Sequence, residues 1–394
     1  MKEFLTIAAD RVKNLAGSPT VSIMDKARKL KASGRDVVDL SGGDPDFPTA
    51  PHITQAAIEA LQNGFTHYTS SQGIPELLQA ISQKLENENG VSYNPKTEII
   101  VMPGAKQALY IAVQSIVNPG DEVILFDPAW VSYAPCVELA GGVPIYVTMN
   151  MHTGNSELHQ SIKAAITSRT RLVIINSPNN PTGQVWTKEQ LQILAEFAEH
   201  KNIYVLSDEI YEKIIFDDLK HHSIASLPGM SKRTMVLNGL SKSHAMTGWR
   251  LGYIAAPEAI SKEMLKIHQH SSTCAPSFVQ KGAVAAFTGP QDYTNHMVAR
   301  YKVRRDALVS RLNSIAGIHC EFPQGAFYAF PNIAGTGLSD MEFTDRLLEI
   351  EAVAVTPGIA FGNAGAGHIR LSFANSDEML SEGADRIKRF VSTL

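Results

Sequence analysis

The stretch that decides the fold runs from residue 171 to residue 211 and reads RLVIINSPNNPTGQVWTKEQLQILAEFAEHKNIYVLSDEIY. It opens with an apolar run, Arg171–Asn176, which ends at Ser177-Pro178. A helical pattern follows over Lys188–Glu199, and a second apolar run covers Ile203–Ser207. A strand, a helix and a strand in this order predict two parallel strands joined by a helix that covers one face of a sheet.

The same alternation continues on both sides of this stretch. A helical pattern over Gln107–Val117 lies between apolar runs, and four further strands are expected at Glu98–Met102, Glu122–Phe126, Thr234–Asn238 and Leu251–Ala255. Nearly continuous apolar character is typical of strands that are buried on both faces. We therefore predict an α/β fold with a mostly parallel central sheet flanked by helices.

The last hundred residues change in character and predict a smaller α+β domain. Long helical patterns over Asn295–Ile315 and Met341–Glu351 flank short strands at Ala326–Phe330 and His368–Phe373. The N-terminal arm contains a helical pattern over Ser22–Ala32, which we expect to pack with this domain. The predicted division is an arm and part of the small domain at 1–45, a large domain at 46–285, and the small domain at 286–394.

Composition excludes several classes of function. The formal net charge of −4 over 394 residues predicts no basic surface and hence no nucleic-acid partner. The three cysteines are far apart, so neither a disulfide framework nor a metal site is expected. Residues 1–10 lack the apolar core of a signal peptide, and no apolar run has the length of a membrane span. We therefore expect a cytoplasmic protein without membrane contact.

Polar residues follow the predicted strands at their carboxyl ends, where ligands bind in open α/β sheets. Gly104, Ala105 and Lys106 open a helix, and its free amides attract phosphate, although an ordinary turn has the same sequence. Trp130 follows the next strand and can stack on a flat ring or simply belong to the core. Asn180 lies in a turn-forming Asn-Asn-Pro-Thr-Gly run, and its amide can also bind a ring hydroxyl or a carboxylate.

Two further strand ends carry ionisable groups. Asp208 and Glu209 compete for the role of a buried carboxylate, which needs a positive partner such as a pyridinium nitrogen. Tyr211 follows and can reach the same ring. Lys242 can form a Schiff base with a carbonyl cofactor, and Arg250 offers a planar fork for phosphate. Five strand ends that each supply a part for one phosphorylated pyridine ring indicate a common site.

With these residues the sequence resembles the class I aminotransferases of PLP (pyridoxal 5′-phosphate) fold type I, particularly the bacterial aspartate aminotransferase-like branch. The resemblance covers nearly the whole chain. The lysine followed eight residues later by arginine is its most specific motif. The motifs are Gly43-x-Pro45-Asp46-Phe47, Tyr68 in His-Tyr-Thr-Ser-Ser-Gln-Gly, Asn179–Gly183, Ser207–Tyr211, Ser241-Lys242 with Gly248-Trp249-Arg250, and His368–Ser372.

The resemblance implies PLP as cofactor and a role for each matching residue. Lys242 would hold PLP as a Schiff base and move the substrate proton, and Asp208 would pair with the pyridine nitrogen. The other implied cofactor contacts are Tyr211 and Asn180 at the ring hydroxyl, Trp130 on the ring face, and Gly104, Ala105, Lys106, Ser241 and Arg250 around the phosphate. The implied substrate contacts are Arg370 at the α-carboxylate with Asn180 and the backbone of Gly43. Tyr68 would reach the phosphate of a neighbouring subunit, which implies a homodimer with composite sites.

The reaction expected from this resemblance moves an amino group from an L-α-amino acid to a 2-oxo acid. A β-lyase on the same scaffold is the alternative, because the same lysine and ring would serve it. A PLP-sensing regulator would need an added DNA-binding domain and a basic face. Side-chain specificity stays open among acidic, aromatic, basic and small neutral amino acids, because the arm reads Ala-Gly-Ser-Pro-Thr at 16–20 where many relatives have Lys-Pro-Ser-Pro-Thr. We expect Ser18–Thr20 and His270–Pro276 to line the side-chain pocket.

Overall fold

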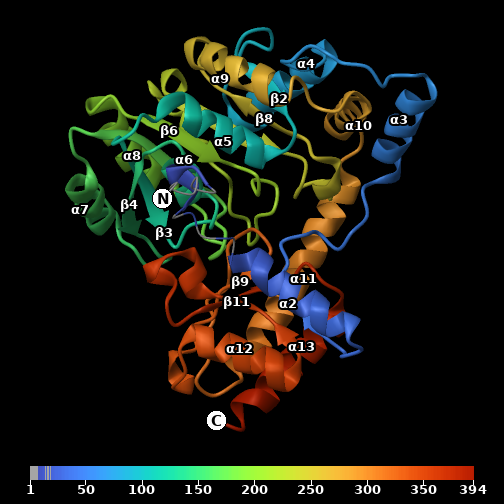
Figure 1. Cartoon of the computed structure of the whole chain (residues 1–394), viewed down its shortest axis with the longest axis vertical. Coiled ribbons are helices and arrows are strands. Elements are labelled where there is room, and N and C mark those ends of the chain that lie inside the picture. The colour runs from blue at the N-terminus through green and yellow to red at the C-terminus, as the bar shows by residue number, and fades with distance from the viewer. Residues whose placement is uncertain (1–7, 14, 16, 18) are drawn as a thin grey trace, which may run out of the picture.

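A seven-stranded sheet forms the centre of the larger part of the molecule (Figure 1). The computed structural model describes residues 8–13, 15, 17 and 19–394. Within these residues the strand order is β2-β8-β7-β6-β5-β3-β4, and β8 alone runs antiparallel to its neighbours. The strands are β2 (Ile99–Met102), β3 (Glu122–Asp127), β4 (Val143–Thr148), β5 (Thr170–Asn176), β6 (Tyr204–Asp208), β7 (Thr234–Gly239) and β8 (Gly252–Ala255).

Helices cover both faces of this sheet because successive strand residues point to opposite sides. Val123 packs in one apolar cluster and its neighbour Ile124 in another. One face is covered by α5 (Ala105–Ile116), α6 (Tyr133–Leu139) and α9 (Glu258–Ser271). The opposite face is covered by α4 (Pro75–Lys84), α7 (Asn155–Ala165), α8 (Lys188–His200) and α10 (Ser277–Thr288), with α3 (Pro51–Gln62) packed on α10.

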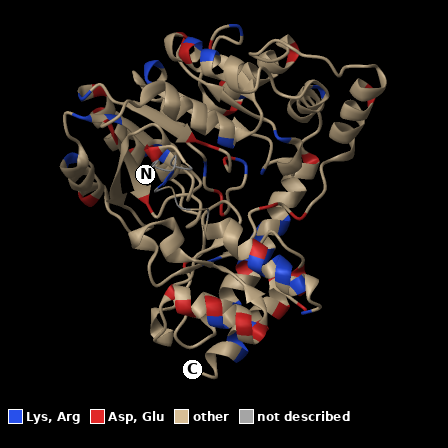
Figure 2. Ribbon diagram, viewed as in Figure 1, with Lys and Arg blue, Asp and Glu red and all other residues tan. Residues whose placement is uncertain are grey.

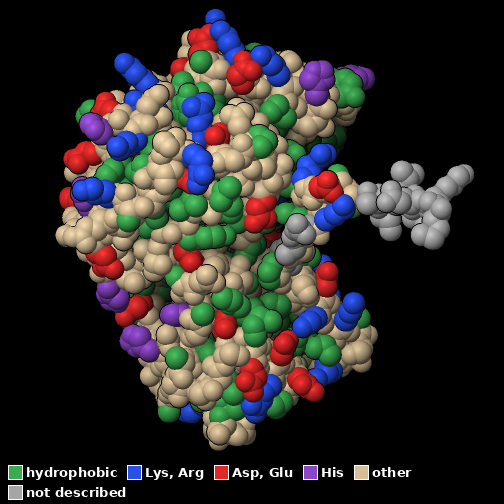
Figure 3. All heavy atoms as spheres, turned by 60° about the vertical axis from the view of Figure 1, so that its left-hand side comes forward, with side chains coloured by type: hydrophobic (Ala, Val, Ile, Leu, Met, Phe, Trp, Pro, Cys, Tyr) green, Lys and Arg blue, Asp and Glu red, His purple; other side chains and the backbone are tan. Residues whose placement is uncertain are grey.

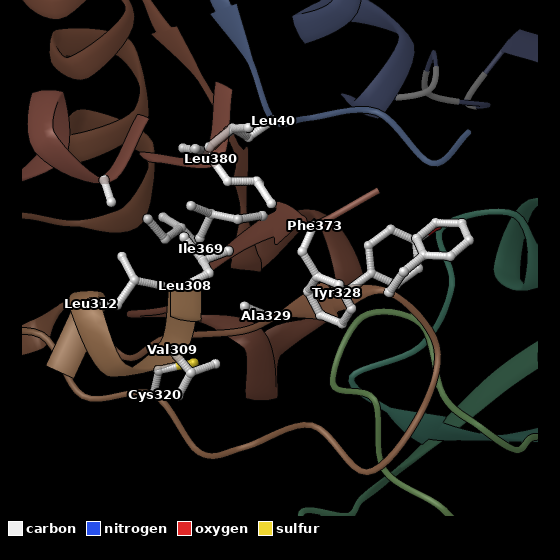
Figure 4. Close-up of a cluster of buried hydrophobic side chains, with 14 of the residues drawn as sticks. Leu40, Leu308, Val309, Leu312, Cys320, Tyr328, Ala329, Ile369, Phe373 and Leu380 are labelled. Atoms are coloured by element: carbon white, nitrogen blue, oxygen red, sulfur yellow. The ribbon is translucent and has the colours of Figure 1, made fainter. Parts of the chain in front are cut away.

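The smaller part, at the bottom of Figure 1, is built around a second apolar core. In Figure 4, Leu40 from the N-terminal segment lies with Leu308, Ile369, Phe373 and Leu380 from the C-terminal region. The elements are α2 (Pro19–Ala32), β1 (Val38–Asp39), α11 (Asp292–Asn313), β9 (Tyr328–Ala329), α12 (Asp340–Glu351), β10 (Val353–Ala354), β11 (Thr356–Pro357), β12 (Ile369–Ser372) and α13 (Asp377–Val391). A short helix, α1 (Asp10–Lys13), precedes them.

Segments far apart in sequence meet in this part. Strand β1 pairs in parallel with β10, while β11, β12 and β9 form an antiparallel sheet. Ile23 and Ala27 of α2 pack against Leu348, Ala352 and Ala354. Burying these apolar side chains, rather than helix propensity, stabilises the arm helix, whose exposed face is polar.

The expected α/β class is confirmed, but β4 of the central sheet and the two-residue strands β1, β10 and β11 were not expected. Each expected strand and helix is present with ends shifted by a few residues, which is the usual uncertainty of helix and strand boundaries. Strand β4 was missed because it lies at the sheet edge, where most of its side chains are exposed or half-buried. Its sequence also contains Pro144, which weakens a strand pattern but is tolerated at an edge.

Charged side chains lie mostly outside the central sheet. In Figure 2 they gather on the helices of the smaller part, where acidic and basic residues alternate. The face drawn in Figure 3 likewise mixes both signs among polar and apolar patches. In the part of the chain that the structure describes, none of the helices combines the length and apolar character needed to cross a membrane.

Candidate active site

A cavity of about 330 Å³ lies between the carboxyl ends of the central strands and the smaller part. It brings together eleven of the residues singled out from the sequence. Those from the larger part are Ala105, Lys106, Trp130, Asn180, Asp208 and Tyr211 together with Ser241, Lys242 and Arg250. Those contributed by the smaller part are Gly43 and Arg370.

Lys242 follows β7 and projects its amine into this cavity. Its Nζ donates a hydrogen bond to the carbonyl oxygen of Gly43 at 2.5 Å. Burial is the main cause that lowers the pKa of Lys242 to about 8; Arg370 and Arg250 lower it further, while Asp44 and Asp208 act in the opposite direction. An amine with this pKa is partly uncharged near neutral pH, which a nucleophile or general base requires.

Asp208 ends β6, is buried and lines the cavity. The hydroxyl of Tyr133 donates to its Oδ2 at 2.7 Å, and the backbone amide of Ile210 donates to its Oδ1 at 3.2 Å. Burial raises the pKa of Asp208 to about 6 despite these donors. A carboxylate desolvated in this way gains most from a cationic partner inside the cavity. Glu209, the competing candidate, does not line the cavity.

Tyr211 and Asn180 lie beside Asp208 and carry polar groups into the same space. The hydroxyls of Tyr211 and Tyr328 are 2.8 Å apart. The backbone amide of Asn180 donates to Oδ1 of Asn176 at 2.8 Å, which fixes the loop after β5. Both side chains are buried, so their polar groups are held in defined positions.

The other end of the cavity has the features of an anion site. Helix α5 begins at Ala105, and Gly104 before it has a φ of 89°, a left-handed conformation that favours glycine. A Cβ on Gly104 would come within 2.5 Å of Nη2 of Arg250, so the guanidinium lies directly against the start of the helix. Arg250 itself has a left-handed φ of 54°. Amides at a helix N-terminus beside a guanidinium form a binding site for phosphate.

Arg370 is buried and fixed on two sides. Its Nη1 donates to Oδ1 of Asn180 at 3.0 Å, and its Nη2 donates to the carbonyl oxygen of Ser41 at 2.6 Å. The guanidinium also lies over the ring of Tyr328, 4.5 Å from its centre. Its Nε is buried and has no hydrogen-bond acceptor among the described residues. A fixed cation with a free donor is suited to a carboxylate ligand.

Two residues and one segment that the sequence predicted at the site do not line this cavity. Gly104 stands behind the wall, in contact with Arg250, while Tyr68 is 85% exposed and lies elsewhere on the surface. Thr20 lines the cavity, but Ser18 is not among the described residues, and the 270–276 segment does not contribute to the lining.

Sequence reasoning missed two tyrosines that hold predicted residues in place. Tyr133 bonds Asp208 and stacks edge-on against Trp130, and Tyr328 contacts both Tyr211 and Arg370. Tyr133 lies three residues after Trp130, and Tyr328 lies in an expected strand. Nothing local distinguishes them from core tyrosines, because their partners are far away in the sequence.

The residues of the cavity fit PLP when tested against its chemistry. The phosphate matches the start of α5 with Arg250, the pyridine nitrogen matches the desolvated Asp208, and the carbonyl carbon matches the amine of Lys242. Gly252 supports this fit, because a Cβ there would lie 2.3 Å from the backbone nitrogen of Ala105. Only glycine lets β8 approach the helix start so closely.

Comparisons with known proteins find one family that covers most of the chain. Residues 35–387 match the family model described as aminotransferase class I and II. The aspartate aminotransferase of Musicola paradisiaca is 44% identical over 385 residues, covering 98% of this chain and 96% of that protein. The aspartate/prephenate aminotransferase of Cereibacter sphaeroides is 41% identical over 402 residues, covering 99% and 100%.

A solved structure shows the same fold. The aspartate aminotransferase of Rhizobium meliloti superposes with a TM-score of 0.94 at 37% identity, covering 98% of this chain and 99% of that one. The family is PLP-dependent in general, and its solved members have PLP fold type I. The chain therefore belongs to the class I and II aminotransferases and is an aminotransferase of PLP fold type I.

Proposed function

We propose that the chain binds PLP on Lys242 and transfers amino groups between L-α-amino acids and 2-oxo acids at this cavity. When bound, PLP supplies an electron sink for the electrons released at the substrate Cα. Asp208 would hold the ring nitrogen protonated, and Tyr211 and Asn180 would bond the ring hydroxyl. Trp130 would cover the ring face, while Ser241, Arg250 and the amides of Ala105 and Lys106 would bind the phosphate, with Gly104 allowing their approach.

The proton transfer is assigned to Lys242. Its pKa of about 8 leaves roughly a tenth of the amine uncharged at pH 7 and more as the pH rises, so it can remove a proton from the substrate Cα and return it elsewhere. Arg370 would hold the substrate α-carboxylate through the donors that face the cavity, helped by Asn180 and the backbone of Gly43. A substrate held at this end presents its Cα to the lysine.

The observation that carries the proposal is that Lys242, Asp208, Arg370 and the start of α5 meet in a single cavity. The test is an absorbance titration of the PLP-loaded protein with single amino acids and no oxo acid. A stable change of the cofactor band with one equivalent of 2-oxo acid supports transamination. Ammonia and pyruvate, with the band returning, would support the β-lyase instead. Lys242→Ala should abolish the half-reaction, and retained turnover would defeat the assignment.

We further propose L-aspartate, or another dicarboxylic amino acid, as a substrate. Two relatives with high coverage carry aspartate in their names. Lys106 supplies a second positive group, because this residue lines the cavity and its Nζ lies 4.9 Å from the centre of the Trp130 ring. Within the described residues, no carboxylate lies within ion-pair distance of Lys106. Lys106→Gln should lower kcat/KM for aspartate more than for alanine, and an equal effect on both would refute this use of Lys106.

We propose that the protein is a cytoplasmic homodimer whose active sites contain residues from both subunits. We also propose that the chain divides into an arm with part of the small domain (1–45), a large domain (46–285) and the small domain (286–394). Tyr68 supports the dimer, because a tyrosine that is 85% exposed and does not line its own cavity is available to a second subunit. Sedimentation of the protein and PLP affinity of Tyr68→Phe test this assignment. A monomer, or an unchanged PLP affinity, would refute it.

A further inference from the structure

A buried cluster of charged side chains lies behind the proposed PLP site. Asp208 and Glu209 are adjacent at the end of β6, and adjacent residues of a strand point to opposite faces of the sheet. Asp208 lines the cavity, whereas Glu209 is fully buried among side chains on the other side. Glu212, one turn later, points to the same cluster, and Tyr211 between them returns to the cavity.

Glu209 is held by several donors. Its Oε1 accepts hydrogen bonds from Oγ of Ser207 at 2.9 Å and from Oγ of Ser223 at 2.6 Å. Its Oε2 accepts from Nδ2 of Asn89 at 3.0 Å and lies 3.0 Å from Nε2 of His221. The backbone amide of Glu209 also donates to Leu237 of β7 at 2.9 Å. This carboxylate therefore fixes the segment that leaves β6.

Glu212 is bound by a second set of donors. Asn89 and Asn238 each donate from Nδ2 at 2.7 Å, and the ammonium of Lys84 pairs with it directly. Lys84 is 8% exposed and Glu212 9% exposed, so this pair is largely shielded from water, although both residues border a second cavity. Lys84 also donates to Oδ1 of Asn89 at 2.6 Å, which closes the network.

The charges of the cluster balance only when His221 is protonated. Glu209 and Glu212 contribute two negative charges, and Lys84 contributes one positive charge. An uncompensated buried charge is strongly unfavourable. The side chain of His221 is 10% exposed, and its Nε2 lies at ion-pair distance from Glu209 without hydrogen-bond geometry. The ring is therefore placed to supply the missing charge by electrostatic attraction. Burial opposes this, but Glu209 and then Glu212 outweigh it and raise the pKa of His221.

A bound metal is a poorer explanation of the same geometry. Glu209, Glu212 and His221 have ligand atoms within 4.8 Å of one another, as a metal site would require. However, the ammonium of Lys84 already occupies Glu212, and a divalent cation would stand beside it. The oxygens of Glu209 are likewise occupied by hydroxyl and amide donors.

We propose that protonated His221 is a positioning residue for the PLP site. It holds the Glu209–Glu212 turn and thereby orients Asp208 and Tyr211 toward the cofactor. This inference rests on the proposed roles of Asp208 and Tyr211. His221 touches neither cofactor nor substrate, so its effect passes through Glu209. The other titratable groups facing or bordering the cluster are Lys84, Glu88, Tyr93, Glu212, Lys213, His222 and Tyr253.

The test uses the full-length protein and three variants. His221→Gln removes the positive charge of the imidazole. The double variant Glu209→Gln/His221→Gln also removes one negative charge and so restores the neutrality of the cluster. His222→Gln, at the exposed neighbouring histidine, is the matched control. PLP affinity and the pH midpoint of the bound-cofactor absorption band are measured for each. His221→Gln should weaken PLP binding about tenfold and shift the midpoint, while the double variant should recover to within about threefold of the unmodified protein.

The outcomes separate this inference from the proposed function. If the unmodified protein binds PLP through Lys242 but His221→Gln matches His222→Gln in affinity and midpoint, the positioning role is refuted and the proposed function stands. If PLP does not bind through Lys242, the proposed function fails. If a chelator lowers the PLP affinity and added Zn²⁺ restores it, the cluster is a metal site and the inference is overturned.

A second measurement does not depend on the folding of His221→Gln. Imidazole nitrogen chemical shifts of the protein labelled with ¹⁵N-histidine report the protonation of each ring. We expect one histidine to keep its doubly protonated signal to a higher pH than the other histidines and to lose this difference in Glu209→Gln. The absence of such a histidine, or its persistence in Glu209→Gln, would overturn the proposal.

Discussion

Replacing Asp208 with asparagine should stabilise the PLP-free protein while weakening PLP binding. Asp208 is buried, and its pKa is raised from 3.8 to about 6, mainly by burial. At neutral pH the folded PLP-free protein therefore holds a desolvated negative charge. Asparagine has nearly the same shape and carries no charge. Its single oxygen can still accept the hydrogen bond from Tyr133, while the 3.2 Å bond from the backbone amide of Ile210 is lost.

The magnitude and sign follow from the shift in pKa. A rise of about two units, at ~1.4 kcal/mol per unit, corresponds to about 3 kcal/mol. Because the folded pKa is higher than the unfolded one, the folded state binds the proton more tightly. The protein therefore loses this stability as pH rises through the interval from 3.8 to about 6, and the full penalty applies above it. Asp208→Asn should remove the penalty at pH 7.5 and have little effect near pH 4.

The assay is denaturant unfolding of the PLP-free protein at pH 7.5 and at pH 4.5, together with PLP titration. We expect the variant to be more stable at the higher pH by up to about 3 kcal/mol and to bind PLP about 10- to 100-fold more weakly, because a hydrogen bond to a charged group is lost. Asp218→Asn, at an exposed position, is the control. A variant less stable than the unmodified protein at pH 7.5, or equally stabilised at both pH values, would refute the reasoning.

Other substitutions probe different parts of the site. Gly252→Ala places a Cβ 2.3 Å from the backbone at the start of α5, so it should lower the stability by about 1–3 kcal/mol and weaken PLP binding. Thermal unfolding and PLP titration measure these effects. Gly248→Ala is the control, because a Cβ there has no neighbour within 4 Å and should change neither property. Arg370→Lys loses the planar guanidinium and should lower kcat/KM for amino acids about 10- to 100-fold while the PLP affinity stays unchanged. Weaker PLP binding by this variant would contradict the proposal that Arg370 binds the substrate. Tyr133→Phe removes a donor that lowers the pKa of Asp208, so this pKa should rise above about 6. The pH dependence of PLP binding checks it, and an unshifted dependence would show that the hydroxyl has no such effect.

The sequence by itself predicted the fold class and most of the candidate site residues that the structure brings together in one cavity. Strands buried on both faces are continuous apolar runs, and their ends carry contiguous polar motifs, so local patterns were sufficient to predict them. Lys242, Asp208 and Arg250 follow strands whose carboxyl ends meet at one edge of a parallel sheet, so a shared site could be inferred without coordinates. Strand β4 escaped because an edge strand with exposed side chains lacks that pattern.

Only the tertiary structure decided which side chains face one another across the chain. Tyr328 meets Tyr211 and Arg370 from a segment more than a hundred residues after Tyr211, and no local signal marks such a contact. The residue pattern likewise left Asp208 and Glu209 in competition, since both are acidic residues at one strand end, and only the family resemblance favoured Asp208. The alternation of side chains across the sheet separates them, because it turns Asp208 into the cavity and Glu209 into the charged cluster behind it. What lies on each face depends on long-range packing, which no short stretch of sequence contains.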